Sequence, residues 1–427
     1  MDESGDEKHW QELLDAAVKA SGENRPEEAR THLFEAIREA EKFGPDDLRL
    51  ADTLFRMAYW LTALGEFATA ETYWQRFLKI AATTLPPDDP RWLLPLQSLA
   101  TYYHNQGKTL EAGKVLSQAL AIARKVDLHV KSPLHAANLR DIVAQLLVTH
   151  GRYAEAEEWF QLTLAYARDK LGPDHEALGL LLQHMAELAR IQGKYSQSEE
   201  MSLQALVILE KLHKPNHPWI GRNLTNLADV YERLGNPAKA QTCMKRALRI
   251  AIKSLGRHHP DVAGTLARLG MLYFHEEKIR QARVCLESSL KTRKRVFGAN
   301  HPDVARTLQD LAAVWLHEEE NLMARSMLQE AYRILSHALG ANHPEVMTVV
   351  ANLAVVHHRN QQYAEAEKLY RRVLAVYEET LGPDHPKVAS LMQKYAMLLR
   401  ETGRAKETRE MERRAQAIPS QREPGYS

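Results

Sequence analysis

Histidine is a common metal ligand and proton carrier, and six histidines recur at a fixed interval from residue 175 onward. They stand 42 residues apart, at His175, His217, His259, His301, His343 and His385. Ligands of one zinc ion lie about 2.0–2.1 Å from it, whereas packed helices are about 8–10 Å apart. Histidines separated by a whole pair of helices therefore cannot share an ion. Each stands where a helix N-cap belongs, so we predict that they are linker residues and that the protein binds no metal.

The sequence contains no motif that would support catalysis. The two HEE segments that begin at His275 and His317 do not match the HExxH zinc pattern. Neither a nucleophile elbow, a phosphate-binding glycine loop nor a paired cysteine motif occurs. Cys243 and Cys285 occupy the same position of adjacent repeats, which should separate their Cα atoms by more than the about 7 Å that a disulfide allows. We therefore predict two reduced thiols, no cofactor and a protein that is not an enzyme.

Composition and charge exclude further classes of function. The chain of 427 residues has 56 lysines and arginines against 55 acidic residues, which gives a net charge of +1. No broad attraction to nucleic acid follows from this balance. The N-terminus is acidic rather than apolar, and no stretch approaches the roughly 20 apolar residues of a membrane span. We predict a soluble, cytoplasmic protein without membrane insertion.

Helix-breaking residues mark an internal repeat. Turn residues fall at Asn24, Gly65, Gly107, Gly151, Gly193, Gly235, Glu277, Glu319, Gln361 and Gly403. Small residues stand seven positions before each turn, at Ala17, Ala58, Ala100, Ala144, Ala186, Ala228, Gly270, Ala312, Ala354 and Ala396. Others stand five positions after it, at Ala29, Ala70, Ala112, Ala156, Ser198, Ala240, Ala282, Ala324, Ala366 and Thr408. Small residues at both positions let two helices approach closely, so each repeat is expected to form a helical hairpin.

One hairpin cannot bury both of its faces, so the hairpins must stack. The sequence therefore predicts an all-α solenoid of about ten antiparallel helical hairpins. We expect an acidic disordered N-terminus over residues 1–7, a capping hairpin over 8–43, nine hairpins in one continuous solenoid over 44–417, and a disordered tail over 418–427. The interval between Gly107 and Gly151 is 44 residues, which places an irregular joint near residues 126–134.

The segment from Asn226 to Tyr273, NLADVYERLGNPAKAQTCMKRALRIAIKSLGRHHPDVAGTLARLGMLY, resembles the 42-residue tetratricopeptide repeats of kinesin light chains. The resemblance covers nearly the whole chain and implies a right-handed superhelical array. It also implies that the first helix of each hairpin lines the inner surface. Function is less constrained, because arrays of this kind have many roles.

In that family, the position nine residues before the turn is often asparagine, whose amide can donate to and accept from a peptide backbone. Only Asn226 and Asn352 keep it here, and charged residues stand at neighbouring inner positions. The candidate peptide-binding residues are Arg222, Asn226, Asp229, Arg233, Arg268, Arg306, Asp310 and Asn352. Guanidinium groups suit carboxylates, so an extended segment with acidic side chains is the expected ligand. The alternative is that these charges only pair with one another.

The favoured function is a non-enzymatic scaffold or adaptor whose concave groove binds a peptide segment of a partner protein, without nucleic acid. Membership of a larger complex would suit this role. The alternative is a regulatory array whose curvature changes when a ligand binds and which thereby signals to a second protein. None of these patterns identifies the partner.

Overall fold

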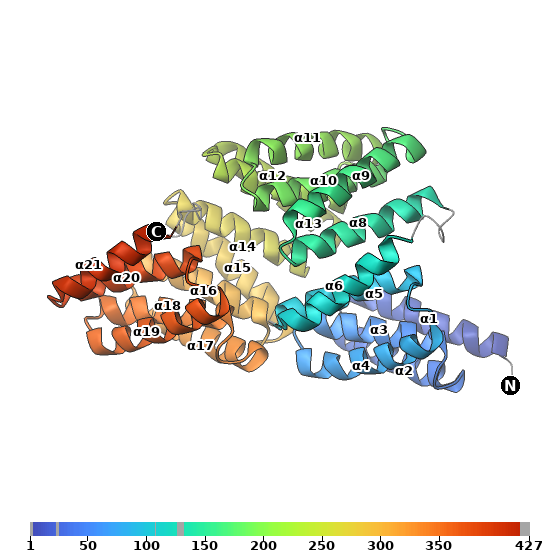
Figure 1. The fold of residues 1–427 in the computed structure, drawn as a ribbon, viewed down its shortest axis with the longest axis horizontal. Helices are drawn as coiled ribbons and strands as arrows, with labels where there is room; N and C mark the ends of the chain where they lie inside the picture. Colours follow the sequence, from blue (N-terminus) through green and yellow to red (C-terminus); the bar gives the residue numbers. More distant parts are fainter. Residues whose placement is uncertain (1–2, 23–24, 107, 126–131, 419–427) are drawn as a thin grey trace. The chain divides into compact units, whose positions relative to one another are not determined.

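A computed structural model describes all residues except 1–2, 23–24, 107, 126–131 and 419–427 (Figure 1). The chain divides into two compact units, residues 1–265 (unit 1) and 266–427 (unit 2). The described residues form helices and no strands, which confirms the predicted all-α class. The ten predicted hairpins each correspond to a pair of described helices. The continuity of the array over residues 44–417 stays a prediction.

The helices of unit 1 follow one another as paired segments. They are α1 (Glu3–Gly22), α2 (Pro26–Lys42), α3 (Leu48–Ala63), α4 (Phe67–Thr84), the short 3-10 helix η1 (Pro90–Trp92), α5 (Leu93–Asn105), α6 (Thr109–Ala123), α8 (Pro133–Thr149), α9 (Tyr153–Leu171), α10 (Glu176–Ile191), α11 (Tyr195–Leu212), α12 (Pro218–Arg233) and α13 (Pro237–Leu255). The two helices of each hairpin pack against each other, and α2, α9 and α11 each pack against the first helix of the next hairpin.

The boundary between the units falls within α14 (Pro260–His275), and the remaining helices belong to unit 2. They are α15 (Ile279–Phe297), α16 (Pro302–His317), α17 (Asn321–Leu339), α18 (Pro344–Arg359), α19 (Tyr363–Thr380), α20 (Pro386–Glu401) and α21 (Ala405–Ala417). The same pattern of packing recurs, because α16, α18 and α20 each contact both the preceding and the following helix.

The ends of the chain differ from the sequence-based prediction. Helix α1 begins at Glu3, so residues 3–7, which were expected to be disordered, are helical. Ile418 was assigned to the tail, but it follows α21 directly and is buried. The rest of the expected tail, residues 419–427, lies outside the described residues. So do residues 126–131 of the expected irregular joint.

The small residues around each turn are the contact points of the paired helices. Ala228 and Ala240 of the α12–α13 hairpin are 2% and 0% exposed, and their counterparts are buried throughout the two units. In unit 2 the first of these positions is Gly270, where a Cβ atom would lie 2.8 Å from Cγ of Leu286. The close crossing predicted from residue size is therefore confirmed.

The six linker histidines cap the first helices that follow them, as the sequence predicted. In each, the imidazole Nδ1 accepts a hydrogen bond from the backbone N–H two residues later, over 3.0–3.4 Å. In five of the six, the residue after the histidine is a proline that opens the helix, where its missing N–H costs no hydrogen bond. The Nδ1 atoms of these six histidines thus serve as helix caps. In the described part of the chain, no group of three or more His, Cys, Asp or Glu side chains is placed to hold a metal ion.

Candidate partner-binding face

The first helix of each hairpin carries the positions at which the sequence predicted a binding surface. We call this surface the first-helix face and define it by the residues 13, 10, 9, 6 and 2 positions before each turn. In unit 1, α5 contacts α8, α8 contacts α10, and α10 contacts α12. In unit 2, α18 contacts α20. Side chains at these positions can therefore meet across successive hairpins within each unit.

Four of the predicted residues lie on α12 in unit 1. Arg222 is exposed, while Asn226, Asp229 and Arg233 are half-buried. Asp229 and Arg233 are engaged with other residues. Arg222 makes no hydrogen bond or ion pair with a described residue, but its charge acts on His184 of α10 and disfavours protonation of that imidazole. The guanidinium donors of Arg222 thus have no hydrogen-bond acceptor among the described residues, whereas Arg233 is engaged with another residue.

A polar network that the sequence did not predict crosses the first-helix face of unit 1. His184 Nδ1 lies 2.9 Å from Oδ2 of Asp141 on α8, and the Gln145 amide donates to Asp141 Oδ2 over 2.8 Å. The Gln97 amide of α5 donates in turn to Oε1 of Gln145 over 3.0 Å. Burial disfavours the charged imidazole, but the Asp141 carboxylate outweighs it, so the pKa of His184 is raised. The network joins α5, α8 and α10.

The other four predicted residues lie in unit 2. Arg268 of α14 and Arg306 of α16 are exposed, and Asp310 of α16 and Asn352 of α18 are half-buried. Arg268 is engaged with another residue. All four therefore lie on first helices, as predicted, but their surroundings differ from those of Arg222.

Arg306 is held by two carboxylates. Its Nη1 donates to Oδ1 of Asp303 over 2.6 Å, and its Nε donates to Oε1 of Glu345 at the start of α18 over 2.6 Å. Neighbouring groups that exclude water from part of the guanidinium act against its charged form, but these ion pairs outweigh that effect and raise the pKa of Arg306. Arg306 thus ties α16 to α18, which is the charge pairing that the sequence left open as the alternative to ligand binding.

Asp310 has a different environment. Burial raises the pKa of its carboxyl to about 6, although the charges of Arg293 and His275 act against this shift. Arg293 reaches from α15 and donates from Nη1 to the Asp303 carbonyl over 2.9 Å and to the Thr307 hydroxyl over 2.8 Å. The guanidinium of Arg293, whose charge acts on Asp310, therefore already donates hydrogen bonds to two other residues of α16.

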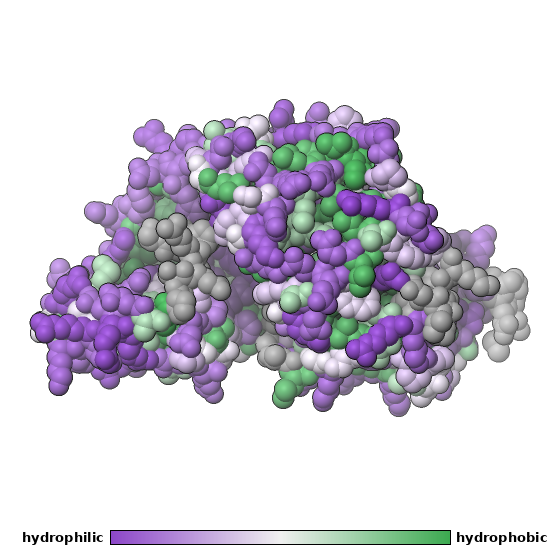
Figure 2. Space-filling view, turned by 45° about the horizontal axis from the view of Figure 1, so that its top comes forward, coloured by the Kyte–Doolittle hydropathy of each residue, from purple (hydrophilic) through white to green (hydrophobic). Residues whose placement is uncertain are grey.

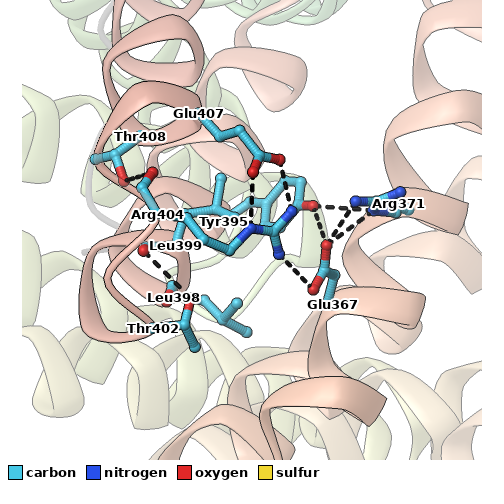
Figure 3. A network of polar contacts seen from close by, with 9 residues as sticks. All are labelled: Glu367, Arg371, Tyr395, Leu398, Leu399, Thr402, Arg404, Glu407 and Thr408. Atoms are coloured by element: carbon cyan, nitrogen blue, oxygen red, sulfur yellow. Dashed lines mark hydrogen bonds and ion pairs between the residues drawn. The ribbon is translucent and has the colours of Figure 1, made fainter.

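A second network holds the last two hairpins together (Figure 3). The Glu367 carboxylate of α19 accepts from the Tyr395 hydroxyl over 2.8 Å, from Nη2 of Arg371 over 2.7 Å and from Nη1 of Arg404 over 2.7 Å. Arg404 also donates to Glu407 (Figure 3). Burial would raise the pKa of Glu367, but these donors outweigh it and lower the pKa to about 2. Arg371, Tyr395 and Arg404 supply these donors, so the network is a clamp that joins α19, α20 and the start of α21.

The side of the molecule seen in Figure 2 is mainly hydrophilic, with hydrophobic residues gathered in patches between the polar ones. None of the helices in the described part of the chain is both long enough and apolar enough to cross a membrane. Cys243 and Cys285 are free thiols that are half-buried, and burial raises the pKa of each. Neither thiol is therefore an activated nucleophile.

Comparison with solved structures gives helical repeat proteins. A Rap protein complexed with Competence and Sporulation Factor has a TM-score of 0.54 and 12% identity, over 86% of this chain and 97% of that chain. The apo form of RapI has a TM-score of 0.53 and 12% identity, over 66% of this chain and 97% of that chain. A putative kinesin light chain of Podosopora anserina with nearly identical TPR-like repeats has a TM-score of 0.42 and 21% identity, over 48% of this chain and 98% of that chain. At these identities the likeness to the Rap proteins shows the fold alone.

No protein of curated function matches the sequence significantly. A family model described as tetratricopeptide repeat matches residues 134–210, 176–253, 224–293, 261–337 and 345–421. A second model with the same description matches residues 52–83. Because these matches cover more than half of the chain, it belongs to the tetratricopeptide-repeat family.

Proposed function

We propose that the protein is a non-enzymatic scaffold, and that the first-helix face of unit 1 binds an extended, acidic peptide segment of a partner protein. Membership of the tetratricopeptide-repeat family supports a role in protein–protein interaction. Stacked repeats present extended surfaces for such contacts. The site of binding is inferred from the charges on that surface.

The observation that carries this proposal is the different environment of two arginines at the same repeat position. Arg306 in unit 2 is held by Asp303 and Glu345. Arg222 has Trp219 where unit 2 has Asp303, and it makes no ion pair with a described residue. An exposed guanidinium without a carboxylate partner keeps its planar set of donors for a carboxylate of a ligand.

Two neighbours of Arg222 suit the remainder of an extended peptide. Asn226 follows four residues later, so both side chains project from the same side of α12. Its amide can pair with the N–H and C=O groups of a peptide backbone. Leu180 of α10 stands at the repeat position that Arg222 occupies on α12, and it is half-buried, so part of its apolar surface is available to a ligand side chain. The three residues together favour a peptide that carries both acidic and aliphatic side chains.

The test uses the full-length protein on an array of short immobilised peptides, in which each acidic sequence has a matched copy with Glu and Asp replaced by Gln and Asn. We expect wild-type protein to prefer the acidic copies, and this preference to weaken as salt rises from about 50 to 500 mM. Arg222→Glu should lower binding to them by about tenfold or more, because it places like charges opposite each other.

The matched control is Arg249→Glu on α13. Arg249 is exposed, lies on the second helix of the same hairpin, and makes no hydrogen bond or ion pair with a described residue. This variant changes the net charge by the same amount and should bind like wild type. Equal losses in both variants would mean that binding responds to overall charge, and unchanged binding by Arg222→Glu would place the ligand elsewhere.

A further inference from the structure

At the joints between hairpins, three chemically different side chains cap the helix that follows: a carboxylate, a hydroxyl or an imidazole. Before α3 and η1, the carboxylates of Asp47 and Asp89 accept from the backbone N–H two residues later, over 2.8 and 2.9 Å. Before α8, the hydroxyl of Ser132 accepts over 3.4 Å. From α10 onward, every cap on a first helix is an imidazole, with N–H to Nδ1 distances of 3.1, 3.4, 3.1, 3.0, 3.2 and 3.1 Å at His175, His217, His259, His301, His343 and His385.

An imidazole can accept at Nδ1 only while it is neutral and carries its proton on Nε2. Protonation turns Nδ1 into a donor, so the capping hydrogen bond is lost. The positive charge that appears then faces the positive end of the helix dipole. Both effects disfavour the capped helix, and histidine is the side chain that ordinarily changes charge between pH 5 and 8.

We propose that these six linkers form a pH-sensitive device, in which acidification from about pH 7.5 to 5.5 loosens the joints before α10, α12, α14, α16, α18 and α20 together. The joints capped by Asp47, Asp89 and Ser132 keep their acceptors over this range. Carboxylates lose their charge only at lower pH, and hydrogen bonding to Arg49 lowers the pKa of Asp47 further.

The joint before α12 has the surroundings that favour this response most. The ring of His217 stacks on that of His213, with centroids 4.1 Å apart, and both rings contact Trp219 edge to face. Burial and the neighbouring His213 lower the pKa of His217, and the charge of Glu176 acts in the opposite direction. Protonation of His217 would remove the capping acceptor and would also place a positive charge against the stacked ring of His213.

Charged neighbours modulate the other joints. Acidic residues stand two positions after the histidine at Asp261, Asp303 and Glu345, and the Asp261 carboxylate lies 3.8 Å from Nδ1 of His259. These carboxylates would attract a positively charged ring, and Asp303 and Glu345 also pair with Arg306. His175 lies between Asp174, which pairs with Lys211, and Glu176, which lies 3.5 Å from Nε2 of His213. At His385 the corresponding residue is Lys387, whose charge adds to the repulsion. We therefore expect the largest effects before α12 and α20.

Other histidines respond to acid with the opposite sign, so the experiment must separate them from the linkers. His184 lies 2.9 Å from Asp141, and His358 lies 3.0 Å from Glu401. The Asp141 carboxylate raises the pKa of His184, so protonation strengthens that pair. A measurement of overall stability would combine these contributions, whereas hydrogen exchange read by mass spectrometry resolves each joint.

The experiment compares the full-length wild type with a variant in which all six linker histidines are replaced by Asn, a good N-cap that does not titrate. Protection at each joint is measured at pH 7.5 and 5.5 and corrected for the intrinsic pH dependence of exchange. We expect wild-type linkers to lose protection by between about twofold and thirtyfold, as the usual contribution of a cap implies. The segments around Asp47 and Asp89 should change little, and the six-fold variant should lose nothing at its linkers.

A single variant, His217→Asn, keeps the proposal testable if the six-fold variant does not fold. It should remove the acid response before α12 and leave the other five joints as internal controls. Linkers of the Asn variant that open with acid as much as those of the wild type would overturn the proposal. So would an equal loss of protection around Asp47 and Asp89.

Discussion

In both units a residue with positive φ closes the turn between the paired helices, but the two units use different residues there. Unit 1 has glycines, with φ between 70° and 74°, at Gly65, Gly151, Gly193 and Gly235. Unit 2 has Glu277, Glu319 and Gln361, with φ of 59°, 61° and 59°, and only then Gly403 at 76°. A residue with a Cβ atom is strained in this conformation. The same turn is therefore more costly in most of unit 2 than in unit 1.

The backbone hydrogen bonds explain why the shape persists although the residue changes. In unit 1, the N–H of Lys194 donates to the Ala189 carbonyl over 2.8 Å, and in unit 2 the N–H of Glu320 donates to the Trp315 carbonyl over 2.9 Å. This bond spans six residues and belongs to the Schellman motif, which satisfies the last carbonyls of a helix. The end of the helix sets the shape of the turn, and the residue type sets only its cost.

One hairpin of unit 2 also differs from those of unit 1 where the paired helices cross. Ala228 of unit 1 leaves room for its own Cβ atom, whereas Gly270 of unit 2 lies so close to Leu286 that even an alanine there would need a neighbour to move. On the first-helix face, unit 1 has a network centred on His184 and Asp141, and unit 2 has the ion pairs of Arg306. The same helical hairpins thus place different polar interactions on the first-helix face of the two units.

The largest effect is expected from Ala228→Leu in unit 1. Ala228 is 2% exposed at a helix crossing, and three extra carbon atoms there should destabilise the hairpin by about 3 kcal/mol. The measurement is urea unfolding followed by circular dichroism. Ala238→Leu, at an exposed position of the same hairpin, is the control and should have almost no effect. Similar curves for the two variants would show that Ala228 does not lie at a crossing.

A smaller effect is expected from Glu367→Gln in unit 2, compared with Glu157→Gln at the same repeat position in unit 1. Glu367 has three donor residues, whereas Glu157 pairs with Lys194 over 2.9 Å and accepts from Gln192 over 3.3 Å. We expect losses of about 1.5–3 kcal/mol and about 0.2–1 kcal/mol respectively, measured by chemical unfolding at pH 7.

The pH dependence checks the cause of that difference. The pKa of Glu367 is lowered from 4.5 to about 2 in the folded protein. The ionised carboxylate therefore contributes fully to the free energy of unfolding above the pKa of the unfolded chain, and this contribution is lost as pH falls toward 2. The stability difference between wild type and Glu367→Gln should therefore shrink between about pH 5 and 2. A difference that stays constant over this range would mean that the carboxylate charge is not what stabilises the clamp.

The features that the sequence predicted are those that recur at one position and act locally. The histidine caps repeat in the last six hairpins and the small residues at the crossings repeat in all ten, so their roles could be inferred from spacing. The network of Gln97, Gln145, Asp141 and His184 could not be inferred in the same way. Its members stand at three different repeat positions, and each depends on a neighbour from another hairpin that does not recur elsewhere.

The same reason explains what the sequence could not settle about the candidate site. Arg222 and Arg306 occupy one repeat position and are equivalent by spacing. What separates them is the residue three positions earlier, which is Trp219 in one case and Asp303 in the other. Such a difference becomes interpretable only when the structure shows that Arg306 reaches Asp303 and also Glu345 of the next first helix. The sequence shows which residues are charged, but only the contacts show which of those side chains are already held in ion pairs within the chain.

The smallest expected effect is a reciprocal exchange at the turn itself, Glu319→Gly in unit 2 and Gly235→Glu in unit 1. Glu319 is exposed, and its side chain makes no hydrogen bond or ion pair with a described residue, so the replacement should remove strain without removing a contact. Glycine also has greater freedom in the unfolded chain, which offsets part of the gain. We expect Glu319→Gly to stabilise the α16–α17 hairpin by about 0.5–1 kcal/mol and Gly235→Glu to destabilise the α12–α13 hairpin by about 1 kcal/mol.

Hydrogen exchange of the amides in each hairpin measures both changes separately. Effects of the same sign in the two variants would show that strain at positive φ is not what distinguishes the turns of the two units.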